Sequence, residues 1–522
     1  MHISALALGA LASGATSQLL VPFGPFGSRF SNAVSAGHKH HIDVGSPSQR
    51  PLTEHHIKST FQSADLGTYK HGQHTLVEQD GSVCNSYGEK QWTGTIDVTD
   101  TRRLFFWAFE SRNDPANDPV IFWMNGGPGG SSMMGAFNEM GACMLRSGDD
   151  VPQPNPWSWN NNATVIFLDQ PAGVGFASVA PGGKLPGGDM DGAEDFQEFL
   201  NIFFRDVFPS KAHLPIHIAA ESYGGHYGPT YVHHILESRR YDAPTAFWGN
   251  ITSMVLIDAV IDFAGPNAGS YKLFCKDKRA EGILTEEQCE IMLASMPEQA
   301  RLARQCEQTL DVNICLAMVV SGTDLTGFYY ELVYKGERNM YHIHRPCTDF
   351  PLCPNPEMGN MTEYLNRNQV KKALEFPESF TFHDINWDIN AAYVGSGSAY
   401  IPTTPKVAYI LDAYKTPKIV DDGKSIGDIR VMALNGNLDA GINSHGNIAQ
   451  YERILWSRMG EYNAADWHDL KDENVRGTGS WKGTKDGRLV FMAVDDAGHM
   501  VPGDAPEASY HILQRWLHNG WR

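Results

Sequence analysis

The stretch Ala219-Ala220-Glu221-Ser222-Tyr223-Gly224-Gly225 decides the fold of this chain. An apolar, strand-like run at 216–219 leads into it, and the small residues Ala220 and Gly224 stand two positions before and after Ser222. A sharp turn from a strand into a helix brings two backbones so close that only small side chains fit at these positions. The pattern predicts a nucleophile elbow. An incidental serine in a glycine-containing loop is the alternative.

Two later segments supply partners for this serine. A strand candidate at 429–434 ends shortly before Asp439, and another at 489–494 ends shortly before His499. The chain order Ser, Asp, His is the one that this elbow architecture uses. His499 is expected to accept the Ser222 proton, and Asp439 is expected to hold the imidazole in the right tautomer and stabilise its charged form.

A glycine-rich loop follows an early strand candidate at 120–124. The loop reads Asn-Gly-Gly-Pro-Gly-Gly-Ser-Ser over residues 125–132. Such a loop can aim backbone N–H groups at a tetrahedral oxyanion, together with the N–H of Tyr223. Phosphate binding is the alternative, but the loop lacks the Gly-Lys-Ser/Thr of a P-loop and the GxGxxG spacing of a dinucleotide site.

Three ordered motifs together resemble the serine carboxypeptidases, in particular their secreted or vacuolar fungal members. They are Trp-x-Asn-Gly-Gly-Pro-Gly-x-Ser-Ser at 123–132, Glu-Ser-Tyr-x-Gly-His-Tyr at 221–227 and Gly-His-Met-Val-Pro at 498–502. The resemblance extends from about residue 61 to the C-terminus. It implies an α/β-hydrolase fold, with a mainly parallel central sheet, helices on both faces, and a helical, disulfide-bearing insertion over the active site.

The resemblance also implies an activity and a set of roles. The activity is release of single amino acids from peptide and protein C-termini at acidic pH through an acyl-enzyme. The implied roles are the triad of Ser222, Asp439 and His499, the oxyanion amides of Gly127 and Tyr223, and a site for the substrate's terminal carboxylate made by Asn125, Gly126, Glu139 and Glu221.

Chemistry supports the last of these roles, although two acids are an unusual choice for binding a carboxylate. The motifs contain no Lys or Arg, the usual partners of a carboxylate. Two glutamates close together in a partly dry site cannot easily both ionise, and a protonated carboxyl can donate a hydrogen bond to a carboxylate. The alternative for Glu139 is an ordinary solvated loop acid.

The chain departs from the family pattern at two places. The family's glycine loop usually ends Gly-Cys-Ser-Ser, whereas this chain has Gly130, and the region at 378–382 that usually carries the partner also lacks cysteine. The segment after a core strand candidate usually reads Gly-Asn-Gly-x-Thr-Asp, whereas this chain has Ile-Asp-Ala-Val-Ile-Asp at 257–262. Its Asp258 and Asp262 stand where the family places part of the pocket for the penultimate residue. An ionised acid there is expected to attract Lys or Arg, with loop solvation or helix capping as the alternative.

The eight cysteines indicate disulfides rather than metal ligands, because none has a zinc spacing. The close pairs Cys275/Cys289, Cys306/Cys315 and Cys347/Cys353 fit the family's cysteine-rich insertion. Cys84 and Cys143 then remain as a candidate pair, although sequence alone leaves the connectivity open. Asn162, Asn250 and Asn360 each begin an Asn-x-Thr acceptor for glycans.

The chain divides into five predicted segments. Residues 1–18 read as a signal peptide, because a short apolar stretch is followed by small residues, and residues 19–54 as a flexible propeptide rich in Pro, Gly, Ser and His. Core segments at 55–262 and 401–522 enclose the insertion at 263–400. The sequence predicts a helix at 191–205 and strands at 104–110, 120–124, 164–168, 216–219, 253–257, 429–434 and 489–494.

The charge composition of the chain limits the classes of partner that it is expected to bind. The formal net charge is −19, from 41 Lys and Arg against 60 Asp and Glu, which argues against nucleic acid or an anionic membrane as a partner. No membrane anchor, cofactor or metal site is expected, and nothing indicates an oligomeric state. The predicted location is extracellular, with the vacuole as the alternative.

Two other functions fit the same scaffold. The triad would also serve an esterase or an acyltransferase, but Asn125, Glu139 and Glu221 favour peptide C-termini. A non-catalytic binding protein is the remote alternative, because all three triad residues are present.

Overall fold

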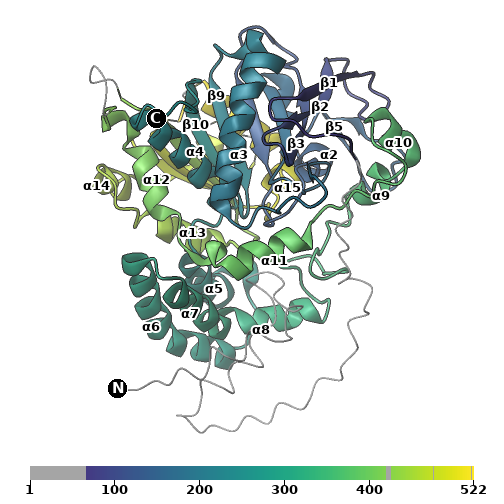
Figure 1. Ribbon diagram of the computed structural model, residues 1–522. Coiled ribbons are helices and arrows are strands. Elements are labelled where there is room, and N and C mark those ends of the chain that lie inside the picture. Colours follow the sequence, from purple (N-terminus) through teal and green to yellow (C-terminus); the bar gives the residue numbers. More distant parts are fainter. Residues whose placement is uncertain (1–65, 419–424, 474, 476, 519, 522) are drawn as a thin grey trace.

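The computed structural model describes residues 66–418, 425–473, 475, 477–518 and 520–521. The predicted signal peptide at 1–18 and propeptide at 19–54 lie outside the described residues. The described chain is built around one large sheet with the strand order β1-β2-β3-β7-β4-β9-β10-β11-β14-β13-β12, and β8 pairs with β3 (Figure 1).

The centre of the sheet is parallel and its flanks are antiparallel. The parallel strands, in spatial order, are β7 (Thr164–Asp169), β4 (Val120–Met124), β9 (Ile216–Glu221), β10 (Ile251–Ile257), β11 (Arg430–Gly436) and β14 (Leu489–Val494). The antiparallel flanks are β1 (His74–Gln79), β2 (Gln91–Asp97), β3 (Arg102–Phe109) and β8 (Ser178–Val179) on one side, and β13 (Gly479–Gly483) and β12 (His468–Asp469) on the other. Two short strands, β5 (Cys143–Met144) and β6 (Gln153–Pro154), pair apart from this sheet.

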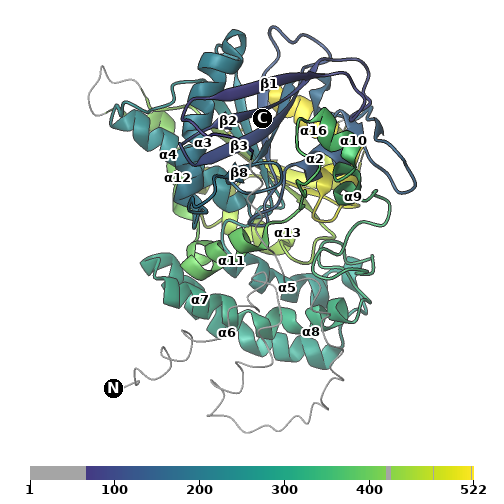
Figure 2. The same cartoon turned by 45° about the vertical axis from the view of Figure 1, so that its right-hand side comes forward.

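Helices cover both faces of the sheet. On one face α3 (Asp189–Ile202), α4 (Gly224–Arg240) and α12 (Thr404–Leu411) pack together, and on the opposite face α16 (Pro506–Leu517) lies behind the strands (Figure 2). The other helices of the core are α2 (Met133–Asn138), α13 (Ser444–Tyr451), α14 (Met459–Asn463) and α15 (Val501–Asp504). The indole of Trp516 anchors α16 by donating to Ser253 Oγ of β10 at 2.9 Å.

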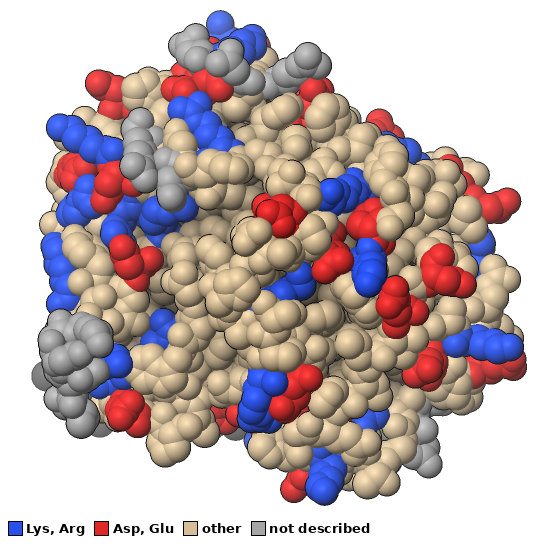
Figure 3. All heavy atoms as spheres, turned by 90° about the horizontal axis from the view of Figure 1, so that it is seen from above, with Lys and Arg blue, Asp and Glu red and all other residues tan. Residues whose placement is uncertain are grey.

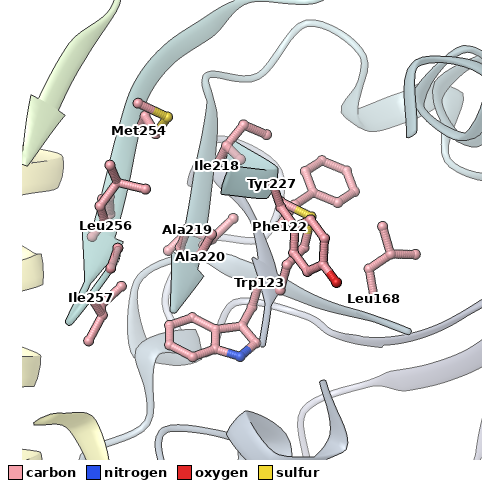
Figure 4. Close-up of a cluster of buried hydrophobic side chains, with 14 of the residues drawn as sticks. Phe122, Trp123, Leu168, Ile218, Ala219, Ala220, Tyr227, Met254, Leu256 and Ile257 are labelled. Atoms are coloured by element: carbon pink, nitrogen blue, oxygen red, sulfur yellow. The ribbon is translucent and has the colours of Figure 1, made fainter. Parts of the chain in front are cut away.

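The central strands are continuous apolar runs because both of their faces are buried. Every residue of β4, β7, β9 and β14 is buried, which is typical of parallel strands covered by helices on both sides. Figure 4 shows part of this core, with Leu256 and Ile257 on β10, Ile218 and Ala220 on β9, and Tyr227 on the side of β9 away from β10. The two strands run in the same direction and their carboxyl ends lie near Ala220 and Ile257.

An insertion separates β10 from β11. It contains α5 (Ala264–Lys276), α6 (Glu286–Thr309), α7 (Val312–Ser321), α8 (Thr323–Tyr334), α9 (Met361–Leu365), α10 (Asn368–Ala373) and α11 (Trp387–Ser396). Helices α5 to α8 form a layer on the side of the sheet where the parallel strands end, and α11 lies between this layer and the sheet (Figures 1 and 2). The predicted α/β-hydrolase fold with a helical insertion is therefore confirmed, while the boundaries at 263 and 400 stay predictions.

Disulfides join Cys275–Cys289, Cys306–Cys315, Cys347–Cys353 and Cys84–Cys143. All four candidate pairs are thereby confirmed. The first three lie in the insertion, and the fourth ties the segment before β2 to β5 in a fully buried position.

The surface and the helices give two further observations. On the face shown in Figure 3, Lys and Arg are interspersed with Asp and Glu rather than gathered by sign. Among the described residues no single helix is both long and apolar enough to cross a membrane, and α7 with α8, bent by 56° at their junction, meets that criterion only as a pair.

Candidate active site

The elbow forms where the sequence predicts it. β9 ends at Glu221, α4 begins at Gly224, and Ser222 between them has φ of 60° in the left-handed region. A Cβ on Gly224 would stand 2.7 Å from the Cβ of Ala220, so a larger residue at either position would force the strand and helix apart. An even closer approach occurs at Gly225, where a Cβ would lie 2.3 Å from the carbonyl oxygen of Val260. This close approach explains why the motif at 221–227 requires glycine at position 225.

Asp439 and His499 are joined directly. Asp439 Oδ2 lies 2.6 Å from His499 Nδ1, and Asp439 Oδ1 accepts a hydrogen bond from the Gly441 N–H at 2.8 Å. Asp439 is fully buried and His499 is 4% exposed. Because Nδ1 faces a carboxylate, it carries the proton and leaves Nε2 as the basic nitrogen.

Ser222 is the least enclosed member of the predicted triad. Its side chain is partly exposed, and it stands at the carboxyl end of β9 while Asp439 and His499 follow β11 and β14. Within the described residues no hydrogen bond joins the Ser222 hydroxyl to His499 Nε2. Such bonds are often long without substrate and tighten in the complex.

The glycine loop packs against the elbow. A Cβ on Gly126 would stand 2.4 Å from the Tyr223 nitrogen, and Gly127 has φ of 112°, which favours glycine. Neither the Gly127 N–H nor the Tyr223 N–H donates a hydrogen bond to a described residue. Two unpaired backbone donors next to a serine can stabilise an oxyanion.

Asn125 joins the two glutamates of the predicted carboxylate site. Its Nδ2 donates to Glu139 Oε1 at 3.2 Å and to Glu221 Oε1 at 3.0 Å, and its Oδ1 accepts from the Trp123 indole at 2.7 Å and from the Gly135 N–H at 2.9 Å. Because both of its accepting directions are occupied, the Asn125 amide is fixed with its donors toward the acids. Glu139 is fully buried, so it is not the solvated loop acid of the alternative interpretation.

Burial and proximity make it costly for the carboxyl groups of Glu139 and Glu221 both to ionise. Burial raises the pKa of Glu139, and burial followed by the nearby charge of Glu139 raises the pKa of Glu221 well above its usual range. Oε2 of each is buried without a hydrogen-bond partner among the described residues. Both effects favour a single proton held by the pair of carboxyl groups over ionisation of both.

Known proteins with similar sequences identify the family of this chain. A family model for serine carboxypeptidases matches residues 83–519. The chain belongs to the serine carboxypeptidase family. The enzyme is accordingly a hydrolase of this class, and the family implies peptide substrates.

Named relatives agree with the family. The carboxypeptidase is 34% identical over 445 residues to carboxypeptidase Y homolog A of Chaetomium globosum, covering 85% of this chain and 74% of the relative. It is 32% identical over 437 residues to the Pyricularia oryzae homolog, covering 83% and 73%. A solved prohormone-processing carboxypeptidase from Saccharomyces cerevisiae matches with a TM-score of 0.63 at 20% identity over 83% of this chain and 91% of that one, which supports the fold.

Asp258 and Asp262, predicted as a side-chain pocket, lie in different surroundings. Asp258 is fully buried and its carboxyl group accepts hydrogen bonds from Asn435 and Gly436. Asp262 is 8% exposed, and its Oδ1 accepts from the Ala264 N–H at 2.8 Å at the start of α5. For Asp262 this is the capping role named as the alternative, and neither side chain offers an open acidic surface.

The glycine loop lacks the family's cysteine but is tied to the same distant region. An isolated antiparallel bridge pairs Gly130 with Ile385, with hydrogen bonds from the Ser131 N–H to the Asp384 carbonyl and from the Asn386 N–H to the Gly129 carbonyl, both at 2.8 Å. Backbone pairing thus holds the loop where the family usually has a disulfide.

Sequence reasoning missed two side chains that contact the site. Trp123 orients Asn125, and it stood in the first motif without a role. Tyr341 lies in the insertion, and its ring centroid is 5.0 Å from that of His499. Its backbone carbonyl accepts a hydrogen bond from the backbone N–H of His499 at 2.8 Å. Trp123 could have been found from its position two residues before Asn125 in the same motif, but no motif marks Tyr341.

The three predicted glycan acceptors differ in accessibility. Asn250 and Asn360 are exposed, whereas Asn162 is partly buried and its Oδ1 accepts from the Tyr510 hydroxyl at 3.3 Å. Asn360 caps α9 through Oδ1, which accepts from the Glu363 N–H at 3.0 Å and leaves Nδ2 for a sugar. Glycosylation stays a prediction at all three.

Proposed function

We propose that the enzyme removes single amino acids from peptide and protein C-termini through an acyl-enzyme at acidic pH. Ser222 Oγ attacks the scissile carbonyl while its proton passes to His499 Nε2, and Asp439 stabilises the imidazolium that forms. The N–H groups of Gly127 and Tyr223 receive the negative charge of the tetrahedral intermediate.

Collapse of the intermediate completes the first half of the reaction. The C–N bond breaks, His499 donates its proton to the departing amine, and the C-terminal amino acid leaves. Water then attacks the Ser222 ester with His499 as the base, which releases the shortened peptide and restores the serine.

The buried Asn125–Glu139–Glu221 cluster carries the proposal for exopeptidase specificity. Asn125 orients the two glutamates through its Nδ2 hydrogens. The Gly126 N–H and the protonated glutamate pair donate hydrogen bonds to the terminal carboxylate of the substrate. Since the pKa of Glu221 lies well above its usual range, the donor persists at acidic pH and is lost as pH rises. Activity on peptides is expected to peak between roughly pH 4 and 6, because His499 protonation limits it below and ionisation of the pair limits it above.

A matched pair of peptides tests this function. A peptide with a free C-terminus is expected to lose residues one at a time, and its C-terminally amidated twin is expected to react far more slowly at low pH. Mass spectrometry of products over time gives both results, and Ser222→Ala, whose hydroxyl carries no packing, serves as the inactive control. Internal cuts in the amidated peptide, or wild-type turnover by the variant, would refute the proposal.

We further propose that the enzyme is secreted, with the vacuole as the alternative. The four disulfides support an oxidising compartment. Sequencing the N-terminus of the mature protein from culture medium and from vacuolar fractions tests this proposal and the cleavage sites near residues 18 and 54.

A further inference from the structure

A fourth carboxyl group, that of Asp258, lies beside the side chains of the acid–histidine pair. Asp258 directly follows β10, is fully buried and has φ of 38°. Carboxyl oxygens of Asp258 and Asp439 and a ring nitrogen of His499 all lie within 4.8 Å of one another. Non-glycine residues rarely adopt this backbone conformation, and those that do cluster at functional sites.

The contacts of Asp258 point to the turn that carries Asp439. Its Oδ1 accepts from the Gly436 N–H at 2.9 Å and from Asn435 Nδ2 at 3.1 Å, and its Oδ2 lies 3.2 Å from the same Gly436 nitrogen. Gly436 is the last residue of β11, and its carbonyl accepts the Asp439 N–H at 3.4 Å. Asp258 therefore holds the peptide at which the turn to Asp439 begins.

The titratable groups that face Asp258 are mostly acids. They are Asp439 after β11, Asp504 of α15 and Glu221 at the end of β9, with His499 after β14 as the group that gains a positive charge during the reaction. Burial, and next the charge of Asp439, raises the pKa of Asp258 well above its usual range. Because Asp439 must stay ionised to serve His499, the proton of this acid pair belongs on Asp258.

We propose that Asp258 is a positioning residue for the triad, a neutral carboxylic acid that holds the Gly436–Asp439 turn in place without adding a second negative charge beside His499. The inference rests on the proposed catalytic roles of Asp439 and His499. It assigns to Asp258 no contact with substrate.

Two substitutions separate the parts of this proposal. Asp258→Asn keeps the shape of the side chain and an accepting oxygen, and it replaces the O–H of the acid with an N–H donor. Asp258→Ala leaves the buried Gly436 N–H without its acceptor. The readout is the rate at which a fluorophosphonate labels Ser222 as a function of pH, because this reagent has no carboxylate for the glutamate pair to bind. Asp324→Asn, at an exposed acid in α8 whose pKa desolvation also raises, is the control away from the site.

Asp258→Asn is expected to label within about twofold of the wild-type rate, because a buried hydrogen-bonding group replaced by an equivalent one is nearly neutral. The acidic limb of its profile is expected to coincide with that of the wild type. Asp258→Ala is expected to label about tenfold more slowly or worse, because an unsatisfied buried donor displaces the turn. Asp324→Asn is expected to match the wild type.

Two results would overturn the inference. If Asp258→Asn moves the acidic limb to lower pH, the wild-type Asp258 carries a charge that favours protonation of His499, and it is not neutral. If Asp258→Ala labels at the wild-type rate, Asp258 does not position the turn; should this variant fail to fold, Asp258→Ser, which is too short to reach Gly436, takes its place.

Failure of the inference is distinguishable from failure of the proposed function. If Ser222→Ala retains full peptidase activity, the triad assignment itself is wrong, whatever the Asp258 variants do. If Ser222→Ala is inactive and the Asp258 variants behave against expectation, only the role of Asp258 is rejected.

Discussion

Two buried pairs of acids lie at the same edge of the sheet, and they differ in how many of their carboxyl oxygens have hydrogen-bond partners. In the pair Asp258 and Asp439, all four carboxyl oxygens have hydrogen-bond partners from the Asn435–Gly441 segment or from His499. In the pair Glu139 and Glu221, Asn125 donates once to each acid, and the second oxygen of each is buried without a partner among the described residues.

The difference separates positioning from binding. A pair whose oxygens are all satisfied has nothing left to offer a substrate, but it holds a catalytic side chain in one orientation. A buried pair that keeps a proton has an O–H donor to offer, and a substrate carboxylate can accept a hydrogen bond from it. Changes in the aspartate pair should therefore affect kcat, and changes in the glutamate pair should affect KM for peptides.

The largest expected effect is that of Asp439→Asn. We expect kcat to fall on the order of 10⁴-fold with little change in KM, because an amide at this position favours the wrong imidazole tautomer. Steady-state kinetics on a peptide checks this, with Asp496→Asn as a control at an exposed acid just after β14, the strand that leads to His499. A loss of only a few fold would mean that another acid serves His499.

The second effect concerns the glutamate pair. Glu139→Gln with Glu221→Gln keeps hydrogen-bond donors but removes the titration, so peptide kcat/KM should weaken at low pH and become nearly flat toward neutrality. The sign follows from the raised pKa of Glu221, since the protonated donor of the wild type is lost as pH rises. An ester substrate that depends less on carboxylate binding should respond little.

A persistent alkaline fall would contradict this account of the pair. If the double variant loses peptide kcat/KM above the optimum as steeply as the wild type, the glutamates do not set that limb. A fall in kcat with unchanged KM would place the pair in positioning, and the comparison with the aspartates would break down.

Parts of both acid pairs could be predicted from the sequence, because short motifs indicate where the backbone must turn sharply or approach another segment closely. The elbow and the glycine loop needed small residues at fixed places, and strands such as β4 and β14 were identified to the residue because they are buried on both faces. The flanking strands β1, β2, β12 and β13 were missed. The exposed residues of β1 and β12 leave no apolar pattern, and the buried positions of β2 are mostly polar or small residues.

The direction of a side chain at a strand end is harder to predict. The rule that parallel strands end at one edge placed Asp258 near the site, but its backbone φ of 38° turns the carboxyl group toward Gly436. Tyr341 was missed because the insertion brings it to His499 by tertiary packing, and no local pattern encodes such a contact.

A third effect is on stability. Burial raises the pKa of Glu139, Glu221 and Asp258, and it raises the pKa of Asp169 to about 6 despite hydrogen bonds from Ser131 and two backbone N–H groups. A raised pKa means that the folded state binds the proton more tightly, so stability is fully present below about pH 4 and is lost as pH rises through the folded values.

We therefore expect a higher Tm at pH 5 than at pH 8. Each unit of pKa shift corresponds to about 1.4 kcal/mol. Thermal unfolding followed by circular dichroism at the two pH values measures this, and the Glu139→Gln, Glu221→Gln variant should show a smaller difference than the wild type. Equal Tm values for the wild type would mean that these buried acids do not titrate in this range.

The smallest effect tests whether the binding pair depends on its orienting amide. Trp123→Phe removes the indole donor to Asn125 Oδ1, while the Gly135 N–H still holds that oxygen. Losing one buried hydrogen bond of about 1 kcal/mol should raise KM for peptides about fivefold and leave fluorophosphonate labelling unchanged. Trp159→Phe is the matched control, because Trp159 is equally buried, packs against Trp123 with ring centroids 5.4 Å apart, and donates instead to Ser509. If the two variants raise KM equally, packing rather than the hydrogen bond orients Asn125. If Trp123→Phe also slows labelling, a change in the carboxylate site disturbs the triad, and the glutamate pair and the aspartate pair do not act independently.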